Sequence, residues 1–296
     1  KRHGACGCGA ASGRARASAH RASPMEPAAP FPLPWGAVVK PLAGYSNDSL
    51  TALGLVYGTD KVFHRFTHLY AKVLGPARAA IHRVLEVGTF RGASIRMWAT
   101  WLPHAQIVGL DWFGCVVGRH SSCTPPGFFE QWAAGRVDSR VTLVNASQAD
   151  AGAMAAFVAR ERQAPPFDLI VEDGSHQQRD QQRTLMWLFP LLRPGGIYII
   201  EDIHSGLEPG YDEPRGGEHT TIVVMKRFNR TRVLQSRHLD ADEGSRAYLE
   251  RWIESAETVA TRGSSIHHMT CIVRKRARAP HTRVASPDRS VRMVRL

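Results

Sequence analysis

The stretch HRVLEVGTFRGAS, residues 82–94, decides the fold class. Its first half, HRVLEVG, is a short apolar run that ends at a glycine, which is typical of a buried strand. From residue 92 to 102 the apolar side chains recur at helical spacing, so we expect a helix directly after the turn. A buried strand, a tight turn and a helix begin a parallel β-α-β unit, and this predicts an α/β fold.

Further apolar runs repeat this alternation along the chain. We expect strands at 106–111, 140–145, 167–173 and 197–202, a closing antiparallel pair at SAETVAT (255–261) and HHMTCIV (267–273), and helices at 61–75, 151–162, 180–192 and 245–254. Long loops are expected at 113–139, an irregular insertion, and at 205–218. The pattern predicts a Rossmann-like seven-stranded sheet, mostly parallel with an antiparallel last strand and with helices on both faces.

The net charge of +12 belongs to the two ends of the chain. Residues 1–24 carry +5 and residues 274–296 carry +7, so the body between them is neutral. A cationic tail attracts polyanions without specificity, and it does not indicate a nucleic-acid enzyme. We expect one folded domain at 35–275 between disordered basic tails at 1–34 and 276–296. The first tail is either an organellar transit segment or a translated leader that ends before Met25.

The compartment is predicted from what the sequence lacks. No apolar run reaches the roughly 18 residues that a membrane-spanning helix needs. The five cysteines lack zinc-site spacing and indicate free thiols in a reducing compartment. We expect a cytoplasmic protein without a membrane partner, or an organellar one if the first tail is a transit peptide. The oligomeric state stays open, with a homo-oligomer as one option.

The turn after the first strand is the first candidate binding element. It carries Glu86, Gly88 and Gly92 in an E-x-G-x-x-x-G arrangement, and Phe90 stands where the dinucleotide fingerprint needs its second glycine. An acid at this position is poorly matched to a pyrophosphate. It suits a cationic ligand, such as the amino group or sulfonium of S-adenosylmethionine, which Gly88 would allow to approach the backbone closely.

The next two strands also end in polar residues. Asp111 ends the second strand, where an acid can accept hydrogen bonds from both ribose hydroxyls. Ser147 and Gln148 follow the third strand, where an adenine edge would lie. The alternative for Asp111 is a helix cap. Three successive strand ends with suitable residues favour a nucleoside-containing cofactor.

Five motifs carry a resemblance to a known family. They are YGTDK (57–61), LEVGTFRGASIRMW (85–98), GLD (109–111), FDLIVEDGSH (167–176) and LFPLLRPGGIYIIED (188–202). In this order they resemble the motifs of the TylF/mycinamicin-type macrolide sugar O-methyltransferases, and cephalosporin hydroxylase-like proteins share much of the pattern. The resemblance implies the seven-stranded methyltransferase sheet, S-adenosylmethionine as methyl donor and a requirement for magnesium. We add Thr59 and Ser94, which lie within these motifs, to the expected donor-binding residues.

The sequence departs from the family pattern at two places. Glu172 stands where the family usually has Asp, and HSG at 204–206 stands where relatives commonly have Gln or His followed by Thr-Ser-Tyr. The second departure leaves the acceptor, and therefore the substrate, undetermined by the resemblance.

Acidic residues end the fourth and fifth strands. Carboxylates that converge there repel each other unless a cation neutralises them, and oxygen ligands suit magnesium or another hard divalent ion. By the resemblance, we expect Asp173, Glu201 and Asp202 to bind the metal. Glu172, whose side chain alternates to the other face of the sheet, is expected to be structural. The alternative is that these acids cap helices or pair with arginines of the following helix.

Methylation of an aliphatic hydroxyl explains why a metal and a base would be needed. A divalent ion that binds two vicinal hydroxyls lowers their pKa and aligns the oxygen with the methyl group, and a histidine can then take the proton. We expect His204, two residues past Asp202, to be this base. His176 is the second candidate, and its alternative role is to orient Asp173.

Three other functions stay open. A 2-His-1-carboxylate iron site for oxidative chemistry could be built from His176, His204 and Asp202. The basic tails suggest an RNA or protein methyltransferase, but the neutral body and the sequence EDGSH, in place of N/D-P-P-Y, oppose it. A scaffold would bind the donor without turnover. The favoured function is metal-assisted O-methylation of a sugar or glycoside-like small molecule, without a nucleic-acid partner.

Overall fold

The computed structural model of the protein describes residues 49–116, 122–124, 127–134, 138–240, 242–261 and 268–279. The predicted tail at 1–34 and most of the tail at 276–296 lie outside this part of the chain. Within it, no helix is long and apolar enough to cross a membrane.

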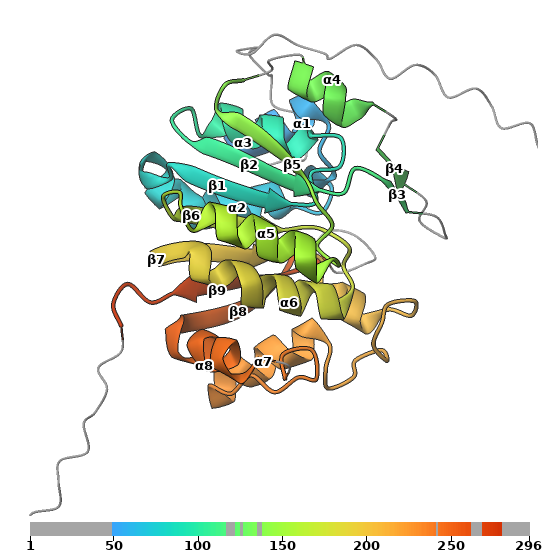
Figure 1. Cartoon of the computed structure of the whole chain (residues 1–296), viewed down its shortest axis with the longest axis vertical. Coiled ribbons are helices and arrows are strands. Elements are labelled where there is room, and N and C mark those ends of the chain that lie inside the picture. Colours follow the sequence, from blue (N-terminus) through green and yellow to red (C-terminus); the bar gives the residue numbers. More distant parts are fainter. Residues whose placement is uncertain are drawn as a thin grey trace, which may run out of the picture. The chain divides into compact units, whose positions relative to one another are not determined.

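A seven-stranded sheet lies at the centre of the fold (Figure 1), and its strand order is β5-β2-β1-β6-β7-β9-β8. Neighbours from β5 to β7 pair in parallel, whereas β9 is antiparallel to both β7 and β8. The predicted sheet and its closing antiparallel pair are therefore confirmed. The strands are β1 (Arg83–Val87), β2 (Gln106–Asp111), β5 (Val141–Asn145), β6 (Phe167–Glu172), β7 (Leu192–Ile200), β8 (Ile253–Thr261) and β9 (His268–Lys275).

Helices cover both faces of the sheet, because apolar strand residues alternate between two cores. On one face, α1 (Ser49–Tyr57), α2 (Phe66–Leu74) and α3 (Ala93–Trp101) share a core with Val84. On the other face, α5 (Ala151–Glu161), α6 (Gln178–Leu188), α7 (Thr221–Thr231) and α8 (Glu243–Trp252) share a core with Leu85. Figure 1 shows α5 and α6 together on this second face.

The order of the strands changes direction between β1 and β6. The chain runs outward from β1 through β2 to β5, and then returns to place β6 on the other side of β1. Ligands of open α/β sheets bind at such a switch point, beyond the carboxyl ends of the strands. The pairing continues past the strand ends here, since the Asp173 amide donates to Val87 (2.9 Å) and the Glu201 amide donates to Glu172 (2.9 Å).

The predicted helix at 61–75 is interrupted, which corrects the sequence interpretation. Arg65 has a φ of 60°, in the left-handed region, and separates η1 (Asp60–Val62) from α2. The α-helix ends where it was expected to, because Gly75 is the C-cap of α2, and Gly75 also begins a 3-10 segment, η2 (Gly75–Ala80). As a result Lys61 lies in a short turn and its side chain is buried.

Two other predictions differ from the structure. The segment 193–196, which lies between the expected helix at 180–192 and the expected strand at 197–202, belongs to β7, and the register shift between Phe167 and Leu169 accommodates it as an irregularity within the strand. Cys115 is disulfide-bonded, so the expectation of free thiols is wrong there, while Cys271 is a buried free thiol. Cys115 lies in the insertion 113–139, which contains the remaining elements β3 (Cys115–Val116), β4 (Ser122–Cys123) and α4 (Phe128–Ala134).

Candidate active site

A cleft of about 770 Å³ opens at the carboxyl ends of β1, β2, β5 and β6. This volume is in the range of small-molecule sites. Most of the predicted donor-binding residues line it, namely Thr59, Gly88, Ser94, Asp111, Ser147 and Gln148. Asp173 and His176 line it as well, so the cleft extends from the expected donor site to the acidic strand ends.

Gly88 and Gly92 both have left-handed backbones, with φ of 90° and 71°. A Cβ on Gly88 would lie 1.8 Å from the carbonyl oxygen of Asp173, so only glycine allows the ends of β1 and β6 to approach this closely. A Cβ on Gly92 would lie 2.5 Å from the ring of Trp132. Gly88 thus approaches Asp173 closely and also lines the cleft, whereas Gly92 is not among the cleft-lining residues.

Asp111 holds two turns at the mouth of the cleft. Its Oδ2 accepts a hydrogen bond from the Phe90 amide and its Oδ1 accepts one from the Phe113 amide, each at 2.7 Å. Both phenylalanines have left-handed backbones. Each carboxylate oxygen can accept a further hydrogen bond. Asp111 therefore caps turns and still presents a fixed carboxylate to the cleft.

Gln148 connects the ends of β5 and β6. Its amide nitrogen donates to Glu172 (3.0 Å) and to Thr184 (3.2 Å), and its oxygen accepts from the Ser175 amide (2.8 Å). Glu172 is fully buried, as expected of a structural residue, and burial raises its pKa to about 7. The Gln148 amide thus holds the turn that carries the Asp-Gly-Ser-His segment.

Glu86 does not face the cleft, and its predicted contact with a cationic ligand needs correction. Its side chain is fully buried and is not among the cleft-lining residues. The carboxylate accepts hydrogen bonds from Ser94 Oγ (2.7 Å) and Trp98 Nε1 (3.4 Å), and Lys61 Nζ lies 3.3 Å away. The cation that Glu86 requires is therefore supplied by the protein.

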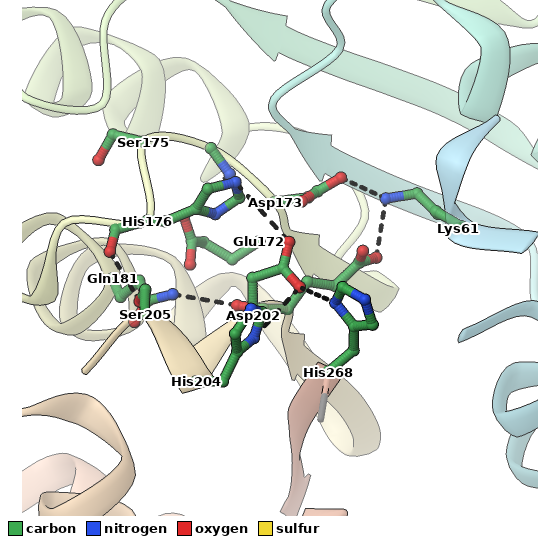
Figure 2. A network of polar contacts seen from close by, with 12 residues as sticks. Lys61, Glu172, Asp173, Ser175, His176, Gln181, Asp202, His204, Ser205 and His268 are labelled. Carbon is green, nitrogen blue, oxygen red and sulfur yellow. Dashed lines mark hydrogen bonds and ion pairs between the residues drawn. The ribbon is translucent and has the colours of Figure 1, made fainter. Parts of the chain in front are cut away.

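Lys61 is a site residue that the sequence interpretation missed. Its buried ammonium donates to Asp173, as Figure 2 shows, and, at 2.8 Å, to Glu201 Oε1. Burial alone would lower the pKa of Lys61, but Asp173, Glu201 and Glu86 raise it well above its ordinary value. Lys61 is the last residue of the YGTDK motif, and this position could have marked it as a site residue. The sequence interpretation instead treated it as the first residue of the expected helix at 61–75.

Asp202 lies at the centre of the acidic strand ends. Its backbone φ is 50° and that of His176 is 58°, so two non-glycine residues of the site have left-handed backbones. Such conformations cost energy and cluster at functional sites. Asp202 Oδ2 lies 3.8 Å from His176 Nε2, and burial raises the pKa of Asp202 to about 7. The carboxylate is thus held in a place where a positive charge would stabilise it.

Two groups of described side chains could hold a metal ion. Donor atoms lie within 4.8 Å of one another in Asp173, His176 and Asp202, and in His64, Asp202 and His268. Oδ1 of Asp202, the residue that the two groups share, is buried without a hydrogen-bond partner, as an unfilled ligand atom would be. The first group contains two of the predicted metal ligands and fits a hard divalent ion, which commonly binds one or two carboxylates and completes its shell with water.

The remaining predicted metal ligand and the predicted iron ligand set do not match either of these two groups. Glu201, the third predicted metal ligand, belongs to neither group, because its carboxylate faces Lys61. The iron set of His176, His204 and Asp202 is not one of the two groups either. Asp202 is instead grouped with His64 and His268, two residues that the sequence interpretation did not consider.

The two candidate bases differ in their surroundings and in their exposure to the cleft. Burial, reinforced by His268, His176 and His64, lowers the pKa of His204 to about 4, which makes it a weak proton acceptor near neutral pH. His204 is not among the cleft-lining residues, whereas His176 is. The geometry therefore favours His176.

Comparisons with known proteins agree with this fold. Residues 85–203 match the family model described as a methyltransferase domain. The chain is 33% identical over 189 residues to an 8-demethyl-8-(2-methoxy-alpha-L-rhamnosyl)-tetracenomycin-C 3'-O-methyltransferase of Streptomyces olivaceus. The aligned region covers 60% of this chain and 43% of that protein. It is 28% identical over 247 residues to the mycinamicin VI 2''-O-methyltransferase of Micromonospora griseorubida, with 78% and 54% covered.

Among solved structures, the chain is similar to the MycE methyltransferase from the mycinamycin biosynthetic pathway in complex with Mg, SAH and mycinamycin VI. The TM-score is 0.54 and the identity 26%, over 77% of this chain and 55% of that one. The chain therefore spans about half the length of these relatives. The resemblance found in the motifs is confirmed: the homologues of this chain are sugar O-methyltransferases of the TylF/mycinamicin type.

Proposed function

We propose that this protein is an S-adenosylmethionine-dependent O-methyltransferase that uses magnesium, or another hard divalent ion, to methylate a hydroxyl of a sugar or glycoside-like small molecule. One observation carries the proposal. The cleft that begins at Asp111 and Ser147 ends at Asp173 and His176, which with Asp202 form a group of side chains that could hold a metal ion. A donor site and a hydroxyl-activating site would thus be adjacent.

The donor would occupy the part of the cleft between Gly88 and Ser147. Asp111, fixed by two backbone amides, would accept hydrogen bonds from the ribose hydroxyls, since it lines the cleft and each oxygen has a free lone pair. Lys61 is adjacent, but its charge is balanced by buried carboxylates. The pocket for a sulfonium is therefore not strongly positive.

Asp173 and Asp202 would hold the divalent ion. When bound, the ion lowers the pKa of an acceptor hydroxyl, and S-adenosylmethionine supplies an electrophilic methyl group. Glu201, the third expected ligand, forms an ion pair with the ammonium of Lys61. Its negative charge would therefore be offset by Lys61 rather than by the metal ion alone. In the MycE complex, magnesium and SAH are present together, which supports this pairing of cofactors.

His176 would accept the proton of the hydroxyl. It lines the cleft, and its Nε2 lies 3.8 Å from Asp202 Oδ2, so an imidazolium formed there would face a carboxylate. A positioned base of this kind contributes on the order of a hundredfold or more to the rate. Its left-handed backbone fixes the ring beside the acidic strand ends.

The test is a methyl-transfer assay with labelled donor over glycosides that carry vicinal hydroxyls, with magnesium or with excess chelator. We expect label transfer with magnesium and none with chelator. Asp173→Asn should lose turnover but keep binding of S-adenosylhomocysteine, while the exposed Asp240→Asn should keep both. Full turnover in chelator would contradict the metal role, and absence of donor binding would contradict the proposal as a whole.

A further inference from the structure

A pocket of imidazoles lies on the side of Asp202 that faces away from His176. We call it the histidine pocket, and it consists of His64, which follows η1, His204 in η4 (Ile203–Leu207), and His268, the first residue of β9. The rings of His64 and His268 stack at 3.9 Å, and the ring of His204 stands nearly perpendicular to that of His268. Methyl transfer, as proposed above, uses none of these three side chains.

The two oxygens of Asp202 face two different groups of donors (Figure 2). Oδ2 lies near His176, whereas Oδ1 lies 3.6 Å from His204 Nδ1 and 3.9 Å from His268 Nδ1. One carboxylate therefore connects the acidic strand ends with the histidine pocket, and each group can use its own oxygen.

Within the histidine pocket, the polar atoms lack partners. Asp202 Oδ1, His204 Nδ1 and His268 Nδ1 are all buried, and none has a hydrogen-bond partner. Their separations of 3.6 and 3.9 Å are too long for hydrogen bonds. Leaving several such atoms buried and unpaired is costly, and it requires an explanation.

A metal ion would satisfy Asp202 Oδ1 and His268 Nδ1 together. Two ligand atoms that are each about 2.1 Å from a tetrahedral ion lie about 3.4 Å apart, and these two atoms lie 3.9 Å apart. The donor atoms of His64, Asp202 and His268 all lie within 4.8 Å of one another. Small side-chain movements would bring them to coordination distance.

The chemistry of the donors selects the ion. Imidazole nitrogens suit zinc, iron, nickel and similar ions, whereas magnesium prefers oxygen ligands. We propose that the histidine pocket is a second metal site, which binds a divalent transition-metal ion of the zinc class through His64, Asp202 and His268, with His204 at its edge.

Such an ion would position Asp202 for the first site. It would hold Oδ1 and leave Oδ2 toward His176, which would stabilise the strained backbone of Asp202. Binding of this second ion does not depend on methyl transfer. The ion should stay bound in the histidine pocket when magnesium is present in excess.

Cobalt(II) is a suitable probe, because its visible absorption reports imidazole coordination in a zinc-like site. The untagged full chain is titrated with cobalt in excess magnesium, and the bound ion is counted after gel filtration. We expect the wild-type protein to bind one more equivalent than His64→Ala and His268→Ala. The exposed His104→Ala serves as the matched control and should bind as the wild-type protein does.

Equal cobalt binding in the wild-type protein and both variants would overturn the proposal, as would complete displacement of cobalt by magnesium. Binding of S-adenosylhomocysteine, measured in parallel, shows that each variant is folded. If His268→Ala does not fold, His268→Asn replaces it, with the same expected loss of one equivalent. Because donor binding and methyl transfer are read separately, failure of the histidine site is distinguishable from failure of the proposed function.

Discussion

The ammonium of Lys61 lies 2.8 Å from Oε1 of Glu201, and both side chains are buried. The same ammonium contacts Asp173 and lies 3.3 Å from Glu86. One lysine therefore neutralises carboxylates from the ends of β1, β6 and β7. Without it, these acids would be buried together with no compensating charge, which is unfavourable in a low-dielectric interior.

Lys61→Met should destabilise the fold strongly. Removing one partner of a buried ion pair costs about 3–5 kcal/mol, because the other charge is left uncompensated. Urea denaturation at pH 7.5 measures the free energy of unfolding. The exposed Lys72→Met on α2 is the control and should stay within about 0.5 kcal/mol of the wild type. In the double variant with Glu201→Gln, part of the stability should return. Equal stability of the two lysine variants would contradict this role.

Donor binding should depend on Asp111 and not on the charge of Glu86. Asp111 lines the cleft, whereas Glu86 faces Lys61 in the interior. Calorimetry with S-adenosylhomocysteine should show affinity about tenfold lower for Asp111→Asn, equivalent to about 1.4 kcal/mol. Glu86→Gln should bind nearly as the wild type does once its folding is verified. The reverse result would restore Glu86 as the donor ligand.

His176→Ala should lower kcat by about a hundredfold or more, the usual scale for loss of a general base. The loss should shrink as pH rises, because hydroxide can replace the imidazole. His204→Ala should have a smaller effect, since burial lowers the pKa of His204 to about 4 and the ring does not line the cleft. Steady-state kinetics from pH 6 to 9 measures both. A larger loss at His204 would reverse the assignment.

The pH dependence of stability should reveal Glu172. Burial raises its pKa from 4.5 to about 7, so between these values the folded state holds a proton that the unfolded state has lost. Its contribution to stability is therefore present below pH 4.5 and is lost as pH rises through 7.

Glu172→Gln removes this dependence and keeps the hydrogen-bonding shape. Relative to the wild type, the variant should gain up to about 3 kcal/mol between pH 4.5 and pH 8, as a shift of this size implies. Denaturant unfolding across this range measures the difference. The exposed Glu254→Gln should track the wild type. A difference that does not change with pH would show that Glu172 titrates normally.

The sequence by itself determined the sheet and most of the cleft. Strand runs such as 82–88 and 106–111 are recognisable because apolar periodicity is local, and the residues just past parallel strands meet at one edge whatever the loops do. Asp111, Ser147 and Asp173 could therefore be placed beside one cleft from sequence alone. The same periodicity failed at 61–75, because the left-handed backbone of Arg65 has no signature in apolar spacing.

The tertiary structure alone decided which charges face one another. Glu86 and Lys61 are 25 positions apart in the sequence, and His64 and His268 are 204 apart, yet each pair is in contact. Electrostatic partners depend on distance and burial, which a linear pattern does not contain. For that reason the sequence did not reveal that Lys61 pairs with the buried acids or that histidines surround Asp202. These contacts depend on the packing of β1, β6, β7 and β9 in one sheet.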